Sequence, residues 1–353
     1  MRGQYAFHYT AACHNLFSST KNFSLNYSAV TFRRNVTFIL APVIFKKCGS
    51  NSTDCQFCLL DFWPNERRDK CIPKSTEYLS YGGPLGVTLT TVITCLTALT
   101  LAVLAVFFVH RYTPVVKANN RLLSFLLLWS LAICFLSTLL LIGQPTKLTC
   151  MFQQAVFGII FVLCIACVLA KTVMVIIAFK ATFPDSKLKR WVGPKLPMSI
   201  VFICTFLQAT LCICWITISP PFPERNLKSQ AGKIIIQCNQ GSNVAFWSML
   251  GFIGLLSLIS FIVAFLARNL PDSFNEAKYL TFSMIVCISV WLSFIPAYLS
   301  TQGMYMVAVE VFAILSSSTG LLSCIFFPKC YIILMRPYMN SKEYLMGRAA
   351  QIT

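Results

Sequence analysis

Three charged residues lie within or beside long apolar runs in this sequence, where a charge has few partners. Lys171 lies near the carboxyl end of one run, Glu276 just before another, and Glu310 near the start of a third. If these runs are neighbouring membrane helices, a Lys171–Glu276 ion pair would hold two of them together. Two alternatives stay open: the lysine extends to the lipid headgroups, and the acid is solvated at a helix start. Glu310 either lines a polar cavity or reaches the outer interface.

A cysteine cluster near the amino terminus is the second chemically distinctive feature. It holds Cys55, Cys58 and Cys71, with Cys48 just before them. A Cys-x-x-Cys pair can ligate zinc, but no partner pair follows at the spacing of a zinc ribbon. Glycosylation triplets in the same region indicate an oxidising compartment, so we expect disulfides whose connectivity the sequence leaves open. We expect no metal site and no cofactor.

The elements that carry these residues are predicted to be membrane helices. Hydrophobic residues make up 57% of the 353-residue chain and charged residues only 11%, whereas about a quarter of a soluble domain is charged. Seven apolar runs have about the 20 residues that a helix needs to cross a bilayer. They are 84–109, 122–142, 150–179, 196–218, 244–267, 279–300 and 305–327. The predicted fold class is therefore an all-α membrane protein, a seven-transmembrane helix bundle with a short disulfide-containing extracellular segment.

The net charge of +18 is read as a topology signal. The basic residues lie in short loops between apolar runs and form no tract or single face, so no nucleic-acid partner is expected. With the amino terminus outside, fourteen lysines and arginines fall in cytoplasmic segments and four in the three opposite loops. This bias predicts a multi-pass plasma-membrane protein with an extracellular amino terminus and a cytoplasmic carboxyl terminus. Candidate glycosylation sites agree with it, because all precede the first run: Asn22, Asn26, Asn35 and Asn51.

Two further cysteines lie on the side predicted to be oxidising. Cys150 begins the third run, and Cys238 lies in the longest outer loop. We expect a disulfide that joins the third helix to this loop. The alternative is two unrelated free cysteines.

Several short motifs resemble class C G-protein-coupled receptors. They are FNEAK at 274–278, WLSFIPAY at 291–298, VEV at 309–311, PKCY at 328–331, PVVKANN at 114–120, LAKT at 169–172 and LDFWPNERR at 60–68. Within the class, PKCY and LPDSFN at 270–275 resemble the vomeronasal type-2 and fish olfactory branch. The resemblance covers about residues 51–337. It implies an unassigned tail at 1–49, the end of a cysteine-rich domain at 50–80, a seven-transmembrane domain at 81–335 and a cytoplasmic tail at 336–353.

The resemblance also implies roles for matched positions. Lys171 and Glu276 match a lock between helices three and six, and Trp291 and Glu310 match an intramembrane pocket for modulators. Cys55, Cys58 and Cys71 match the last cysteines of the cysteine-rich module. The residues expected to contact a G protein are Lys187, Lys189, Arg190 and Arg268.

The implied function is a chemosensory receptor of the pheromone or amino-acid type that activates a heterotrimeric G protein. Membrane lipid, a small-molecule or peptide ligand, and a homo- or hetero-dimer with other class C receptors are the expected partners. Members of the class bind agonist in a large extracellular flytrap domain, which nothing in this sequence resembles. A second expectation is therefore a truncated fragment, silent or constitutively active, that modulates full-length partners.

Other function classes fit the sequence less well. An enzyme is not expected, because His8, His14 and His110 lie in tails and a loop, where no nucleophile and base converge. A retinal-binding pump would need a lysine inside 305–327, and a transporter would show an inverted repeat. Neither feature is present in the sequence.

Overall fold

The computed structural model describes residues 45–47, 55–59, 61–65, 70–180, 195–227, 232–268 and 276–340. The chain divides into two compact units. A small unit holds the segments before Glu77 together with Asn226–Ile235, and a large unit holds the remainder.

The small unit is built from short antiparallel strand pairs. Strand β1 (Phe45–Lys47) pairs with β2 (Cys55–Phe57), and β3 (Phe62–Pro64) pairs with β4 (Cys71–Pro73). Strand β5 (Ser75–Glu77) follows. A disulfide joins Cys58 to Cys71, 13 residues apart. So short a segment has little apolar core of its own, and a covalent link compensates for that.

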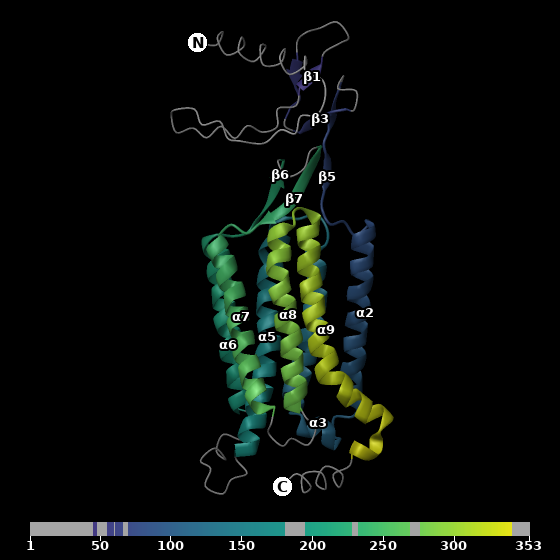
Figure 1. The fold of residues 1–353 in the computed structure, drawn as a ribbon, viewed down its shortest axis with the longest axis vertical. Helices are drawn as coiled ribbons and strands as arrows, with labels where there is room; N and C mark the ends of the chain where they lie inside the picture. Colours follow the sequence, from purple (N-terminus) through teal and green to yellow (C-terminus); the bar gives the residue numbers. More distant parts are fainter. Residues whose placement is uncertain are drawn as a thin grey trace. The chain divides into compact units, whose positions relative to one another are not determined.

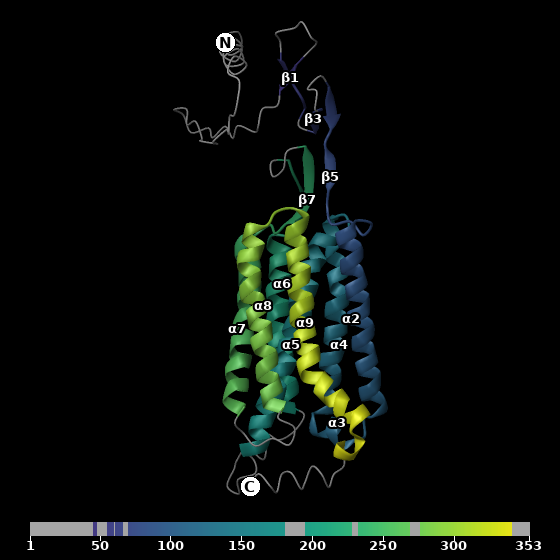
Figure 2. The ribbon, with the colours of Figure 1, turned by 45° about the vertical axis from the view of Figure 1, so that its right-hand side comes forward.

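Seven helices of the large unit are long and apolar enough to cross a membrane, as the sequence predicts (Figures 1 and 2). They are α2 (Pro84–Val109), α4 (Arg121–Ser137), α5 (Lys147–Lys180), α6 (Lys195–Ile218), α7 (Asn243–Ala267), α8 (Glu276–Ser300) and α9 (Met304–Met335). Shorter elements connect them: α3 (Pro114–Ala118), η1 (Thr138–Leu141), η3 (Pro337–Asn340), and the neighbouring strands β6 (Phe222–Asn226) and β7 (Lys233–Asn239). The predicted fold class is confirmed.

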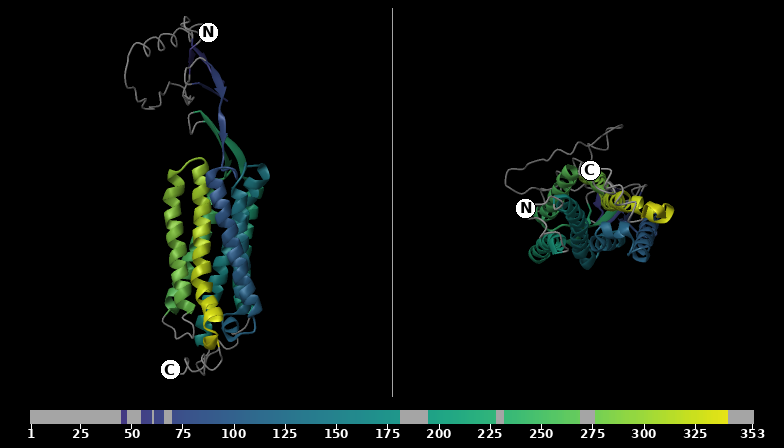
Figure 3. Two further views of the ribbon diagram at one scale, coloured as in Figure 1. Left: turned by 90° about the vertical axis from the view of Figure 1, so that its right-hand side faces the viewer. Right: turned by 90° about the horizontal axis from the view of Figure 1, so that it is seen from below.

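Helix α5 is the central element of the bundle. It contacts α4, α6, α7 and α8, and 61% of its most apolar window is buried against only 22% for α2 and α6. Figure 3 shows the bundle from the side and from below, with α2 and α6 at its margin. A buried polar side chain on α5 therefore needs a hydrogen-bond partner from a neighbouring helix or loop.

Local chemistry explains where the helices begin and how they hold polar residues. Pro84 starts α2, at the position where its missing N–H is not needed. The Ser242 hydroxyl caps α7 by accepting a hydrogen bond from the Ala245 N–H. Threonines inside α2 donate their hydroxyls to the carbonyl one turn earlier, as Thr97 does to Ile93 at 2.8 Å. Hydroxyls satisfied in this way are tolerated in a membrane.

The seventh predicted run ends too early. Its expected end was residue 327, before a proline, but α9 continues to Met335 with Pro328 inside it. A proline removes one hydrogen bond from a helix, and in a packed membrane bundle the neighbouring helices compensate for that loss. Five of the other six predicted runs agree with the helices to within three residues, whereas the run 122–142 extends five residues past the end of α4 and includes η1. The extension of α9 places Lys329 in the bundle, where it is 4% exposed.

Candidate functional site

The end of the bundle at which α5 ends and α8 begins, which we call the inner end, contains a buried group of charges. Glu276, the first residue of α8, is 9% exposed, and its Oε1 accepts a hydrogen bond from Lys329 Nζ on α9 at 2.8 Å. Lys171 Nζ on α5 lies 3.9 Å from the same oxygen. Three helices therefore meet at one carboxylate. We call Lys171, Glu276 and Lys329 the inner charge cluster.

Lys171 makes its hydrogen bonds elsewhere. Its Nζ donates to the Asn119 carbonyl at 2.8 Å, to Asn119 Oδ1 at 2.9 Å and to Ser124 Oγ at 2.8 Å. Asn119 follows α3, and the next residue, Asn120, has a φ of 50°, a left-handed conformation that asparagine tolerates. The turn before α4 and the first turn of α4 together accept three hydrogen bonds from a buried ammonium.

The charges of this cluster do not balance. Two lysines face one glutamate, and Lys171 is only 3% exposed. Buried charges are costly unless they are paired and hydrogen-bonded. The backbone and side-chain oxygens of Asn119 supply the hydrogen bonds that Glu276 does not give to Lys171. Neither alternative kept open for Lys171 and Glu276, a lysine at the headgroups or a solvated acid, matches this burial.

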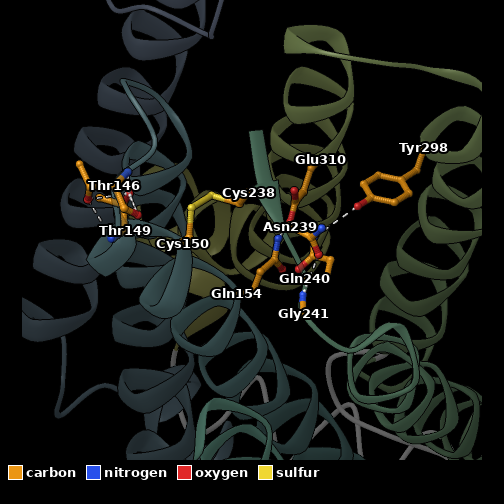
Figure 4. Close-up of a disulfide and its surroundings, with 10 residues drawn as sticks. All are labelled: Thr146, Thr149, Cys150, Gln154, Cys238, Asn239, Gln240, Gly241, Tyr298 and Glu310. Carbon is orange, nitrogen blue, oxygen red and sulfur yellow. Dashed lines mark hydrogen bonds between the residues drawn. A yellow bond between two sulfur atoms is a disulfide. The ribbon is translucent and has the colours of Figure 1, made fainter. Parts of the chain in front are cut away.

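The opposite end of the bundle, which we call the outer end, contains a second polar group, drawn in Figure 4. A disulfide joins Cys150 in the first turn of α5 to Cys238 in β7. One turn further along α5, the Gln154 amide donates a hydrogen bond to Glu310 Oε1 on α9. Glu310 is 7% exposed, so it lies inside the bundle.

The loop beyond Cys238 also contacts the helices. The Gln240 amide donates to Tyr298 Oη on α8 at 3.5 Å, and the Gln240 carbonyl accepts from Trp215 Nε1 on α6 at 3.0 Å. With the disulfide to α5, this loop is attached to three helices. A displacement of the loop would therefore be felt by α5, α6 and α8 together.

An aromatic layer lies between α5 and α8. Trp291 stacks on Phe157 at 5.7 Å between ring centroids and meets Phe161 and Phe294 edge-on at 5.3 and 5.2 Å. Trp291 also lines a cleft between α7 and α8, but Glu310 is not among the residues that line it. The two residues predicted to share a pocket are therefore not brought together in that cleft.

Several predicted site residues lie outside the described residues. They are Lys187, Lys189 and Arg190 among the G-protein contacts, and Asn22, Asn26, Asn35 and Asn51 among the glycosylation sites. Cys55 lies in β2, where side chains are not described. Arg268 is exposed at the end of α7, with its guanidinium 3.8 Å from the centroid of the Phe265 ring.

Sequence reasoning missed four partners in these clusters: Lys329, Asn119, Gln154 and Gln240. A signal existed for two of them. Lys329 interrupts an apolar stretch that continues to Met335, and Gln154 lies one helical turn from Cys150. No three His, Cys, Asp or Glu side chains within the described ranges are grouped so that they could hold a metal ion.

Known proteins have sequences similar to this one. The family described as 7 transmembrane sweet-taste receptor of 3 GCPR matches residues 79–329. Vomeronasal type-2 receptor 26 of Mus musculus is 48% identical over 297 residues, 83% of this chain and 35% of its own length. The extracellular calcium-sensing receptor of Homo sapiens is 48% identical over 273 residues, 77% of this chain and 25% of its own length. The percentage identity to the two receptors is thus the same, and the match to the vomeronasal receptor covers more of this chain.

The chain spans about a quarter to a third of the length of the curated relatives it matches. The matched region is the seven-helix part, which contains both polar clusters and the aromatic layer. The family is one of receptors and not of enzymes. The chain belongs to the class C G-protein-coupled receptors.

Proposed function

We propose that this chain is the membrane core of a chemosensory receptor, which transmits an extracellular ligand signal to a heterotrimeric G protein. The observation that carries the proposal is the inner charge cluster, which joins α5, α8 and α9 through one carboxylate. It lies at the end of the bundle where positive residues accumulate, the end proposed to face the cytoplasm. Rearrangement of these helices is the proposed output.

The cluster has the properties of a two-state element. Glu276 begins α8, so a shift of this helix end along or away from α9 changes its distances to both lysines. Buried ion pairs contribute little net stability but disfavour arrangements in which a charge loses its partner. A ligand shifts such an equilibrium only by binding one state more tightly than the other. We therefore propose the cluster as the lock that keeps the receptor inactive.

The polar group at the outer end of the bundle is the proposed site at which the ligand signal enters. The loop after Cys238 is attached to α5 by the disulfide and to α6 and α8 by Gln240. Glu310 and Trp291 remain our proposed residues for modulator binding, Glu310 through its buried carboxylate and Trp291 through its aromatic face. The pheromone or amino-acid class of ligand is proposed from similarity to receptors named vomeronasal.

The proposed location is the plasma membrane, with the amino terminus outside. This orientation makes Lys187, Lys189, Arg190 and Arg268 available to a G protein, and Asn22, Asn26, Asn35 and Asn51 available for glycosylation. Support comes from the lysine and arginine bias of the loops and from the Cys150–Cys238 disulfide at the opposite end. A protease-protection assay with a tag at each terminus tests it.

A second candidate function is modulation of full-length receptors of the same family. The observation that favours it is that the similarity covers only a quarter to a third of those receptors. In this case the chain has no output of its own, and it changes the signal of a full-length partner in a dimer.

The test is G-protein activation in cells. The tagged chain is expressed with luminescent G-protein dissociation sensors for each Gα class, and surface protein is quantified in parallel. We expect Glu276→Lys to raise basal activation several-fold over wild type, with Asp61→Lys, at an exposed position outside the helix bundle, as the control. Unchanged basal activity at equal surface levels removes the lock. A response seen only when a full-length relative is co-expressed favours the second function.

A further inference from the structure

A cleft between α7 and α8 lies outside both polar clusters. Its volume is about 380 Å³, within the range of small-molecule sites. Trp247, Leu258, Leu292 and Ile295 at its edge are 40–65% exposed on the outer surface of the bundle. Phe294 and Ser257, each 4% exposed, line it toward the interior. In a bilayer such a cleft opens to lipid.

Two glycines give the cleft its space. Gly251 and Gly254 lie one turn apart on α7, and a Cβ built on either would meet no atom within 4 Å. Glycine inside a helix lowers its stability relative to residues such as leucine. At these positions the absence of side chains leaves an open groove on the helix surface.

Polar atoms without partners distinguish this cleft from an ordinary lipid-facing groove. Within the described residues, Ser257 Oγ and Trp291 Nε1 are buried and have no hydrogen-bond partner. Ser248, on the same helix as Ser257, instead donates to the Ala245 carbonyl at 2.8 Å. An indole N–H can only donate, and a hydroxyl can also donate. Both groups therefore suit an acceptor oxygen supplied by a ligand.

The depth of these groups limits the identity of the ligand. Ser257 lies about 15 Å from the nearer end of α7 and Trp291 about 13 Å from the nearer end of α8, so both lie well inside the membrane. Phospholipid headgroups lie at the interface and do not reach this level, and acyl chains carry no acceptor there. The ligand must bring its own oxygen into the hydrocarbon core.

We propose that the α7–α8 cleft is a binding site for a lipophilic small molecule that carries one carbonyl or hydroxyl oxygen and enters from the bilayer. Ser257 and Trp291 recognise the oxygen, and Gly251 and Gly254 leave room for the hydrocarbon. This site does not depend on G-protein coupling, so it can be tested without a signalling assay.

The test uses the full chain reconstituted in phosphatidylcholine vesicles. The probe is a medium-chain alkanol that carries an aliphatic diazirine, and the comparison probe is the same chain without the hydroxyl. After illumination, labelled peptides are located by mass spectrometry over a range of probe concentrations. We expect the alkanol to label 247–258 and 288–295 saturably, and the hydrocarbon probe to label lipid-facing helices without saturation.

Three variants make the result specific. Gly254→Leu fills the cleft without a backbone clash and removes saturable labelling, and Gly251→Leu is the second variant of this kind. Ser257→Ala weakens alkanol binding about three- to tenfold, the effect expected for one lost hydrogen bond. Ala102→Leu, on the exposed face of α2, leaves labelling unchanged. Each variant is first checked for an intact Cys150–Cys238 disulfide and a wild-type unfolding temperature.

Several results would overturn the proposal. Labelling that rises linearly and evenly around the bundle means that acyl chains alone occupy the cleft. Half-saturation of Ser257→Ala at the wild-type alkanol concentration means that no polar recognition by Ser257 occurs. Protection that appears only at high protein density, with cross-links between copies at 247–258, means that the cleft is a contact between receptor chains.

Discussion

Lys329 Nζ lies 2.8 Å from Glu276 Oε1, nearer than Lys171 Nζ at 3.9 Å. The contact joins the start of α8 to the part of α9 beyond Pro328. Lys171 donates its hydrogen bonds to Asn119 and Ser124 instead. The closest pairing at the inner end is therefore between α8 and α9, and Lys171 connects this pair to the turn before α4.

The charge count of the inner cluster predicts the order of its variants in thermal stability. Glu276→Gln leaves two buried lysines without their carboxylate, which costs about 3–5 kcal/mol. Lys329→Met or Lys171→Met each leaves one lysine facing Glu276, so each costs less. Thermal unfolding of the purified variants in detergent measures this order.

The control for that series is Lys278→Met, on α8 but outside the inner cluster. It should match wild type. Equal losses for Glu276→Gln and for both lysine variants would show that the charges act independently and that the cluster is not a unit.

The hydrogen bond between Gln154 and Glu310 predicts a second set of effects. Gln154→Leu leaves the Glu310 carboxylate buried without its donor, and the expected cost is about 1–3 kcal/mol. The double variant Gln154→Leu/Glu310→Leu removes both polar groups and should recover part of this loss. Unfolding midpoints of the two single variants and the double variant give the coupling. Strict additivity would contradict a direct interaction.

The Cys150–Cys238 disulfide is expected to stabilise the outer loop. It closes a segment of 88 residues, and a loop of this length is worth about 4–5 kcal/mol in the chain-entropy model. Because the helices stay in the membrane on unfolding, the measured value should be smaller. Cys238→Ser should lower the unfolding temperature, and Cys214→Ser, at an exposed free cysteine, should not. A gel-shift assay with a maleimide polymer checks that Cys150 becomes free.

The contact between α8 and α9 depends on a small residue. A Cβ built on Gly320 would lie 2.8 Å from Val286 Cγ1, closer than normal contact. Gly320→Val should therefore destabilise the bundle by about 1–3 kcal/mol through overpacking, and Val286→Ala in the same chain should restore part of it. Failure of Val286→Ala to rescue would mean that the close approach is relieved in another way. Gly254→Ala, where a Cβ meets no atom within 4 Å, is the control and should not lower stability.

The fold was predictable from the sequence because membrane helices are encoded locally. Apolar runs such as 244–267 mark α7 almost to the residue. The predicted end of the seventh run was wrong. A proline usually ends a helix, but packing within the bundle tolerates Pro328 inside α9. The error concealed Lys329, which the sequence placed in a cytoplasmic segment.

The polar clusters were only partly predictable, since they depend on contacts across the chain. Gln154 and Glu310 are 156 positions apart, and Lys171 is 52 positions from Asn119. Nothing in a single sequence reports such a pairing. The cost of burying a charge indicates only which residues need a partner, as it does for Lys171, Glu276 and Glu310.

The proposed lock is tested by guanine nucleotide exchange on a purified heterotrimeric G protein, with this chain in lipid nanodiscs. We expect slow exchange with wild type, exchange faster by several-fold with Glu276→Lys, and a return toward the wild-type rate in the charge swap Glu276→Lys/Lys329→Glu, which restores the pair. If all three chains, folded and with an intact Cys150–Cys238 disulfide, give the same exchange rate as empty nanodiscs with every Gα class, the inner charge cluster is not a receptor lock.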